Sequence, residues 1–181
     1  MRRSFFSLKV PKFLYSYKFL ITLFIFLVSV IIFSANLSDS SLTAQAETQK
    51  NDTDSSESFY LQAINNLRAS KKLKPLAIDS RLSSSALSKA NNMVTENYFG
   101  HYSITGKSFS EYIWQSSPNA EKVGENLAKC YSTDQLAFEA LVASPTHYAV
   151  MTASFTNFGV AEVENAKTGC TYTVMHFSQY N

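Results

Sequence analysis

The chain has 181 residues, and its formal net charge of +2 conceals a difference between its two ends. Residues 1–46 carry five basic side chains and one acidic side chain, whereas residues 47–181 carry 11 basic and 13 acidic ones. A nucleic-acid-binding groove needs basic side chains on the folded part of the chain, so this distribution argues against nucleic acid as a partner. The length after residue 46 is that of a single domain and excludes a large multidomain enzyme.

The first 46 residues are typical of an export signal. A basic leader over residues 1–18 precedes the stretch Phe19–Ala35, which is almost entirely apolar. A helix of this length spans roughly 26 Å, close to the ~30 Å hydrocarbon core of a bilayer. The positive-inside rule places the leader in the cytoplasm and everything after the apolar stretch outside. Two alternatives stay open: a signal peptide cleaved near Ala46, which gives a secreted protein, and an uncleaved transmembrane helix, which anchors the protein at the cell surface.

Residues 36–56 are polar and rich in Ser, Thr, Asp and Asn, which is typical of a flexible linker. The folded domain is therefore expected over residues 57–181. Export places Cys130 and Cys170 in an oxidising compartment, where two cysteines are a candidate disulfide pair. Two unpaired buried thiols are the alternative.

Periodicity and capping residues predict a domain with helices first and strands last. The capping-box pattern Asp54–Glu57 opens a helix that Pro75 ends, and Asp79 caps a second helix that ends near Gly100. The later expected elements are a short amphipathic piece at 109–114, an extended segment at 123–130, helices at 132–142 and 144–153, and strands at 158–163 and 170–177. This order indicates an α+β domain.

Several common catalytic motifs are absent. The glycines lie only at positions 100, 106, 124, 159 and 169, and no two of them have the spacing of a dinucleotide-binding, nucleophile-elbow or P-loop motif. No histidine is followed by glutamate, so the zinc-protease motif H-E-x-x-H is missing as well. The sequence therefore gives no support to a nucleotide-binding fold, an α/β-hydrolase or a zincin.

Three local patterns remain, and their order is informative. They are Asn97-Tyr-Phe-Gly-His101, Gly124-Glu-Asn-Leu-Ala128 and Ser144-Pro-Thr-His147. With Asn65-Asn-Leu-Arg68 in the first helix, this ordered set resembles the CAP superfamily, the group of cysteine-rich secretory proteins, antigen 5 and pathogenesis-related proteins that share the SCP domain. The likeness is to short bacterial members and runs from about residue 58 to residue 179.

The resemblance implies a three-layer α-β-α sandwich with a central cleft. Two histidines and two glutamates line that cleft in the family, and several members hold a divalent cation there, often zinc. By motif, His101, Glu125 and His147 take three of these positions. The second glutamate is not evident, because Ser144 stands near its place and no motif supports Glu139 as a substitute.

The residues are chemically suited to such a site, but each has a simpler interpretation. Two imidazoles and one carboxylate can hold zinc with an open position for water, and a carboxylate can also orient an imidazole as a base. Alternatively, His101 caps a helix end, His147 bonds to nearby backbone, and Glu125 is a buried structural carboxylate. His176 shares strand parity with neighbouring Tyr and Val residues and is predicted to be structural or to line the rim.

Aromatic residues flank the candidate histidines at positions 98, 99, 102 and 148, and they could form an apolar rim for a lipid or sugar or belong to the core. We expect an exported CAP/SCP-like domain that binds a small apolar or cell-envelope ligand, or an extracellular protein, in its cleft, with a divalent cation such as zinc at His101, Glu125 and His147. A metal-assisted hydrolase of peptide or cell-envelope polymer is the first alternative. A disulfide-stapled interaction domain with a vestigial cleft is the second. The pattern favours binding over catalysis.

Overall fold

A computed structural model describes residues 55–180 of the chain. The predicted apolar segment Phe19–Ala35, the predicted cleavage position near Ala46 and the Asp54 cap lie outside the described residues. Within residues 55–180, no helix is both long enough and apolar enough to cross a membrane.

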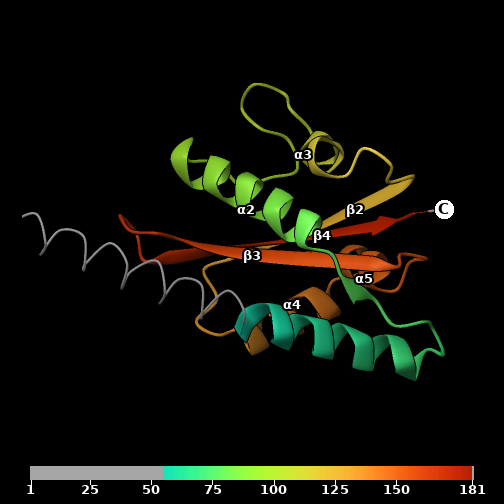
Figure 1. Ribbon diagram of the computed structural model, residues 1–181. Coiled ribbons are helices and arrows are strands. Elements are labelled where there is room, and N and C mark those ends of the chain that lie inside the picture. Colours follow the sequence, from blue (N-terminus) through green and yellow to red (C-terminus); the bar gives the residue numbers. More distant parts are fainter. Residues whose placement is uncertain (1–54, 181) are drawn as a thin grey trace, which may run out of the picture. The chain divides into compact units, whose positions relative to one another are not determined.

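The described elements follow the predicted order (Figure 1). A helix over residues 55–70 comes first. The later elements are β1 (Ala77–Ile78), α2 (Ser80–Thr95), α3 (Phe109–Ser116), β2 (Lys122–Lys129), α4 (Asp134–Ala143), α5 (Pro145–Met151), β3 (Asn157–Asn165) and β4 (Cys170–Gln179). Only β1 was not predicted, because two residues give no periodicity.

Caps fix where the helices begin. The Asp79 carboxylate accepts a hydrogen bond from the backbone N–H of Arg81, as the sequence predicts for α2. Helix α4 begins one residue later than its pattern predicts, because Thr133 rather than Ser132 accepts the hydrogen bond from Leu136. Pro145 is the first residue of α5, where its missing N–H costs nothing.

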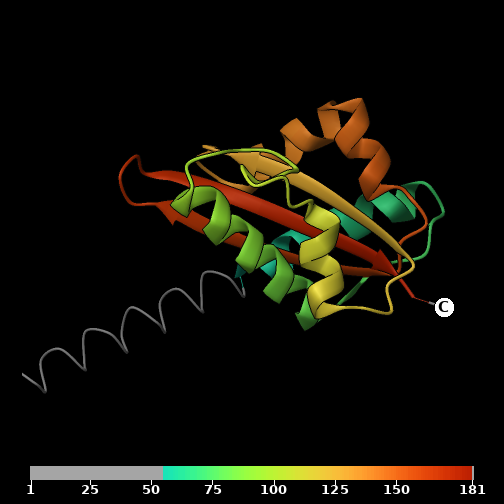
Figure 2. The same ribbon diagram turned by 90° about the horizontal axis from the view of Figure 1, so that it is seen from above.

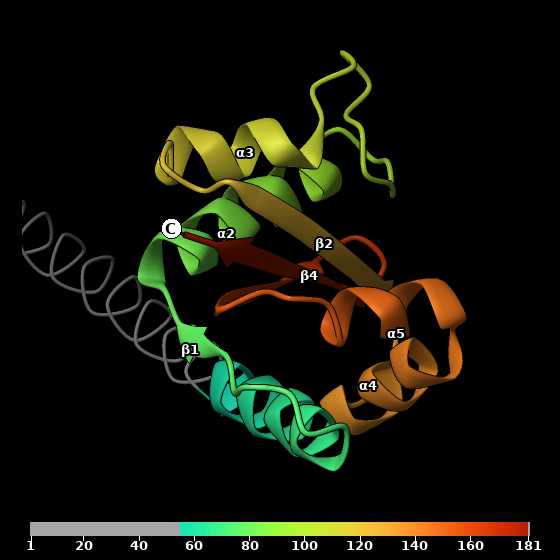
Figure 3. The same cartoon turned by 90° about the vertical axis from the view of Figure 1, so that its right-hand side faces the viewer.

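The strands form one mixed sheet between two layers of helices. The strand order is β1-β3-β4-β2, with β1 parallel to β3 and the other pairs antiparallel. Helices α2 and α3 cover one face, and α4, α5 and the helix over residues 55–70 cover the other (Figures 2 and 3). This confirms the α+β, three-layer fold. It also makes β2 an edge strand that lies between α3 and α5.

Each face of the sheet has its own apolar core. The α2 face buries Ala86, Ala90 and Met93 against Leu127 and Val174. The opposite face, here called the α5 face, buries a larger cluster that includes Tyr60, Ile64, Met151, Phe155, Phe158 and Phe177. The predicted disulfide is confirmed, and it joins Cys130 at the end of β2 to Cys170 at the start of β4.

Candidate functional site

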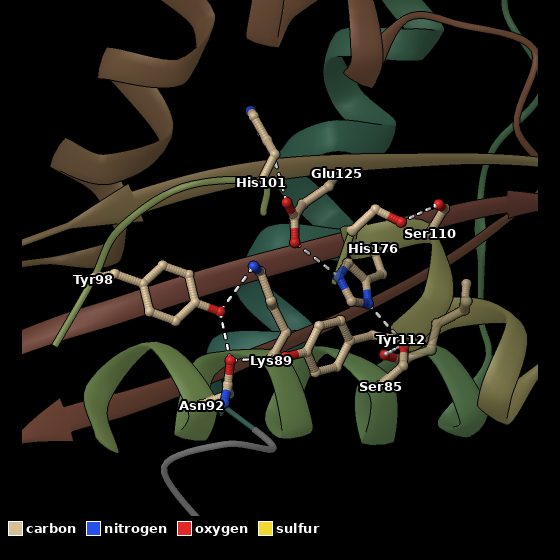
Figure 4. Close-up of polar contacts among 11 residues, drawn as sticks. Ser85, Lys89, Asn92, Tyr98, His101, Ser110, Tyr112, Glu125 and His176 are labelled. Carbon is tan, nitrogen blue, oxygen red and sulfur yellow. Dashed lines mark hydrogen bonds and ion pairs between the residues drawn. The ribbon is translucent and has the colours of Figure 1, made fainter. Parts of the chain in front are cut away.

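The structure brings His101 and Glu125 into direct contact. His101 lies in the loop after α2, and this loop carries it over strand β2 (Figure 4). Its Nδ1 is 2.7 Å from Oε1 of Glu125. The Glu125 side chain has no exposed area, whereas the His101 side chain is 48% exposed. A buried carboxylate therefore orients an imidazole that is open to solvent.

The same carboxylate binds a second, buried histidine. The register of β2 and β4 pairs Glu125 with His176, and Nε2 of His176 is 3.0 Å from Oε2 of Glu125. On the other side of that ring, Nδ1 is 2.7 Å from the Ser85 hydroxyl of α2. Burial lowers the pKa of His176, and the hydrogen bond and charge of Glu125 oppose this only in part. A neutral His176 donates through Nε2 to Glu125 and accepts a hydrogen bond from the Ser85 hydroxyl at Nδ1.

The resulting chain of contacts fixes the tautomer of the exposed histidine. Both Glu125 oxygens act as acceptors, so His101 donates through Nδ1 and keeps the Nε2 lone pair for another partner. Nε2 of His101 has no hydrogen-bond partner within residues 55–180. It can therefore accept a proton, accept a hydrogen bond or bind a cation.

A buried lysine lies beside this chain. Lys89 of α2 has no exposed area, and its ammonium donates to the Tyr98 hydroxyl at 3.1 Å. The rings of Tyr98 and Tyr112 lie 4.9 and 5.4 Å from its nitrogen. Both tyrosine hydroxyls donate to the Asn92 side-chain oxygen (Figure 4). Burial lowers the pKa of Lys89, while the charge of Glu125 raises it.

An open groove begins at the His101–Glu125 pair. This groove, here called the His101 groove, has a volume of about 420 Å³. Phe109, Val123, Val150 and Phe155 give it a mainly apolar wall, and Lys122 lies at its edge with its ammonium 5.0 Å from the Phe155 ring centroid. Its size is within the range of small-molecule sites, and its wall suits a ligand with an apolar part.

His147 is held separately, on α5. Its Nδ1 is 2.8 Å from the Ser144 hydroxyl, and its backbone carbonyl accepts a hydrogen bond from Asn126 of β2. No hydrogen bond or ion pair within residues 55–180 joins the His147 ring to His101 or Glu125. Burial lowers the pKa of His147, and the charge of His101 lowers it further.

The structure does not gather the three predicted metal ligands into one donor set. Glu125 uses both oxygens on histidines, and within the described part of the chain no three His, Cys, Asp or Glu side chains are arranged to hold a metal ion. His101 and His147 each keep Nε2 free of protein partners within that part. These two nitrogens are the remaining candidate ligands for a cation, with Glu125 orienting the His101 ring, and cation binding stays a prediction.

Comparison with known proteins shows the family. The family model of the cysteine-rich secretory proteins matches residues 61–177. The chain belongs to the CAP family. It is 33% identical over 128 residues to the uncharacterized protein YkwD of Bacillus subtilis (strain 168), a match that covers 68% of this chain and 50% of YkwD. The chain thus spans about half the length of this CAP relative.

Solved structures show the same CAP fold. An extracellular protein of Bacillus anthracis that contains an SCP domain gives a TM-score of 0.66 at 22% identity, covering 74% of this chain and 43% of that one. An outer surface protein of Borrelia burgdorferi gives 0.64 at 18% identity, covering 68% of this chain and 92% of that one. At these identities the likeness establishes the fold alone.

Not all of the aromatic residues that flank the candidate histidines are exposed at a rim. Tyr98 belongs to the buried polar cluster around Lys89, whereas Phe99 and Tyr102 are 39% and 66% exposed. The prediction omitted Lys89 and the contact between His176 and Glu125. The only sequence signal for His176 was its parity on β4, which gave its face but not its partner on β2.

Proposed function

We propose that this CAP-family protein works outside the cell by capturing a ligand that has an apolar part in the His101 groove. The observation that carries the proposal is the groove itself, an apolar hollow that ends at an exposed imidazole held by a buried carboxylate. The similarity to an extracellular and to an outer surface protein supports the exported location.

The chemistry of the groove is that of recognition. Val123, Val150 and Phe155 would bury the apolar part of a ligand, and each Å² of apolar area removed from water contributes about 25 cal/mol. His101 supplies one oriented acceptor at Nε2, and its ring loses little freedom on binding because Glu125 already fixes it. This combination favours binding one class of ligand in one orientation.

The test fills the groove from its exposed side. Ala149 lines the groove and is exposed, so Ala149→Trp adds a ring there without entering the core. Ala143→Trp makes the same change at an exposed alanine outside the groove. The full-length chain in a non-ionic amphipol is titrated with the neutral dye N-phenyl-1-naphthylamine, and fluorescence gives the affinity.

We expect the Ala149→Trp chain to bind the dye at least tenfold more weakly than the wild type, a loss of about 1.4 kcal/mol. The Ala143→Trp chain should match the wild type. Equal affinity in all three chains, or no saturable binding in the wild type, would contradict capture in this groove.

A second candidate function is divalent-cation binding, with metal-assisted hydrolysis as its extension. The observation in its favour is that His101 and His147 both use Nδ1 on the protein and leave Nε2 without a partner within residues 55–180. Calorimetric titration with zinc compares the wild type with the His101→Ala, His147→Ala double variant. If the double variant binds zinc as tightly as the wild type, both the cation site and the hydrolase fall. If only the wild type binds, incubation with peptide and with peptidoglycan tests turnover.

A further inference from the structure

A second hollow lies along β2, on the His147 side of the cleft. This His147 hollow has a volume of about 310 Å³. Its floor is apolar and comes from Ala128 of β2 and Leu141 of α4, which are 5% and 3% exposed. At about 30 Å³ for each water-sized group, it holds a ligand of about ten non-hydrogen atoms.

Two exposed aromatic rings stand at the rim of this hollow. Phe99 is 39% exposed and Tyr131 is 42% exposed, so each keeps a large area in contact with solvent. They reach the hollow from different segments, the loop after α2 and the turn after β2. Exposed rings that converge on an apolar floor mark a binding surface more often than isolated ones do.

The charge of the lining is positive. Lys129 is the last residue of β2, and its ammonium lies 4.9 Å from the Phe99 ring centroid. It forms no ion pair within residues 55–180. His147 and Ser144 add polar groups, and none of the residues that line the hollow is acidic. The nearby Glu139 of α4 lies outside the lining and accepts a hydrogen bond from Gln135.

We infer that the His147 hollow binds a small organic acid, a carboxylate attached to an apolar body. The apolar body lies on Ala128 and Leu141 between the two rim rings, and the carboxylate pairs with the Lys129 ammonium in a hollow that His147 also lines. Charge complementarity carries the choice, because a carboxylate would meet a lysine that lacks an acidic partner in the described part. The lining of the His101 groove differs from that of the His147 hollow because it contains a carboxylate, Glu125, which is already bonded to two histidines.

The probes are chosen to match the volume of the His147 hollow. 3-Phenylpropionate and octanoate both have about ten non-hydrogen atoms. The first carries an aromatic ring and the second an alkyl chain, so the pair shows which apolar body the hollow prefers. 3-Phenylpropanamide has the shape of the aryl acid without its charge. The full-length chain in a non-ionic amphipol is titrated with each compound by calorimetry, with the amphipol alone subtracted.

At pH 7 we expect at least one of the two acids to bind, and 3-phenylpropanamide to bind at least tenfold more weakly than the aryl acid. The variant Lys129→Gln should lower the affinity for the acid at least tenfold and leave that for the amide unchanged. Lys167→Gln, at an exposed lysine in the turn between β3 and β4, should bind the acid as the wild type does. Ala140→Trp, which fills the hollow and keeps Lys129, should also abolish binding of the acid.

Three results would overturn the inference: no binding of either acid to the wild type, equal binding of acid and amide, or unchanged binding in the Lys129→Gln chain. The Ala149→Trp chain separates this inference from the proposed function, because it closes the His101 groove and should still bind the acid. Loss of acid binding there would mean that the acid enters the His101 groove instead, which would also overturn the inference while supporting that groove.

Discussion

The functional side chains on the two faces of the sheet are fixed in position by different kinds of contact. On the α2 face, Glu125 is tied through His176 to Ser85, so three elements fix one carboxylate by side-chain contacts. On the α5 face, His147 is held through its own short helix, by Ser144 three residues before it and by one backbone contact to Asn126. The first arrangement fixes a functional group rigidly, and the second leaves space for a ligand.

Gly159 faces α2 and Gly124 faces the α5 side, so alanine substitutions at these two glycines compare how rigidly each face is packed. They give the largest expected change in unfolding free energy. A Cβ on Gly159 would overlap the backbone nitrogen of Ser83 in α2, which cannot move without shifting the helix. A Cβ on Gly124 would instead meet side-chain atoms, the end of the Phe155 ring at 2.7 Å and Val150 at 3.3 Å. We expect Gly159→Ala to lower the free energy of unfolding by about 3 kcal/mol and Gly124→Ala by about 1 kcal/mol. Urea denaturation measures both, and equal losses would remove the contrast between the faces.

Removing a carboxylate on one face and an imidazole on the other should also give unequal losses. Glu125→Ala leaves the buried His176 Nε2 without its acceptor and releases His101, so we expect a loss of about 2–3 kcal/mol in unfolding free energy. His147→Ala removes only the contact with Ser144, and we expect less than about 1 kcal/mol. Chemical denaturation at pH 7 compares them. A larger loss for His147→Ala would mean that the α5 face is the rigid one.

Local signals in the sequence predicted much of this fold. Asp79 and Pro145 mark helix starts because a cap and a missing N–H act within one turn. That His101 and Glu125 share a cleft was implied by the resemblance to the CAP superfamily, which rests on ordered motifs. The disulfide between Cys130 and Cys170 followed from the number of cysteines and the predicted export.

Other contacts between elements could not be predicted. Parity places His176 on one face of β4, but only the register of the finished sheet sets it opposite Glu125. Lys89 lies among polar residues of α2, and a lysine there would ordinarily face solvent. His147 was predicted to converge with the pair, but the orientation of its ring depends on the contact with Ser144 within α5.

The pH dependence of the unfolding free energy should reveal the lowered pKa of the buried His176. Burial lowers the pKa of His176 below its usual value of 6.5, and the charge of Lys89 acts in the same direction. Below about pH 6.5 the unfolded chain therefore takes up a proton that the folded chain does not, and stability falls as the pH falls, by at most about 1.4 kcal/mol per pH unit. His176→Gln should reduce this slope, measured between pH 7 and 5.5. His147→Gln should reduce it less, since that ring is only half-buried; the opposite ranking would contradict this assignment.

Replacing Lys89 gives the smallest expected change in unfolding free energy. It tests whether the buried charge of this lysine stabilises the α2 face. Its ammonium is fully buried with one hydrogen bond and two tyrosine rings as partners, so its desolvation is offset only in part. Methionine fills a similar volume without charge, so we expect Lys89→Met to leave the unfolding free energy at pH 7 unchanged or to raise it by about 1 kcal/mol. Lys129→Met, at an exposed lysine at the end of β2, should change it by less than about 0.5 kcal/mol. A loss of more than about 1 kcal/mol in the Lys89→Met chain would mean that attraction to Glu125 and the two rings outweighs desolvation. The α2 face would then depend on its buried charges.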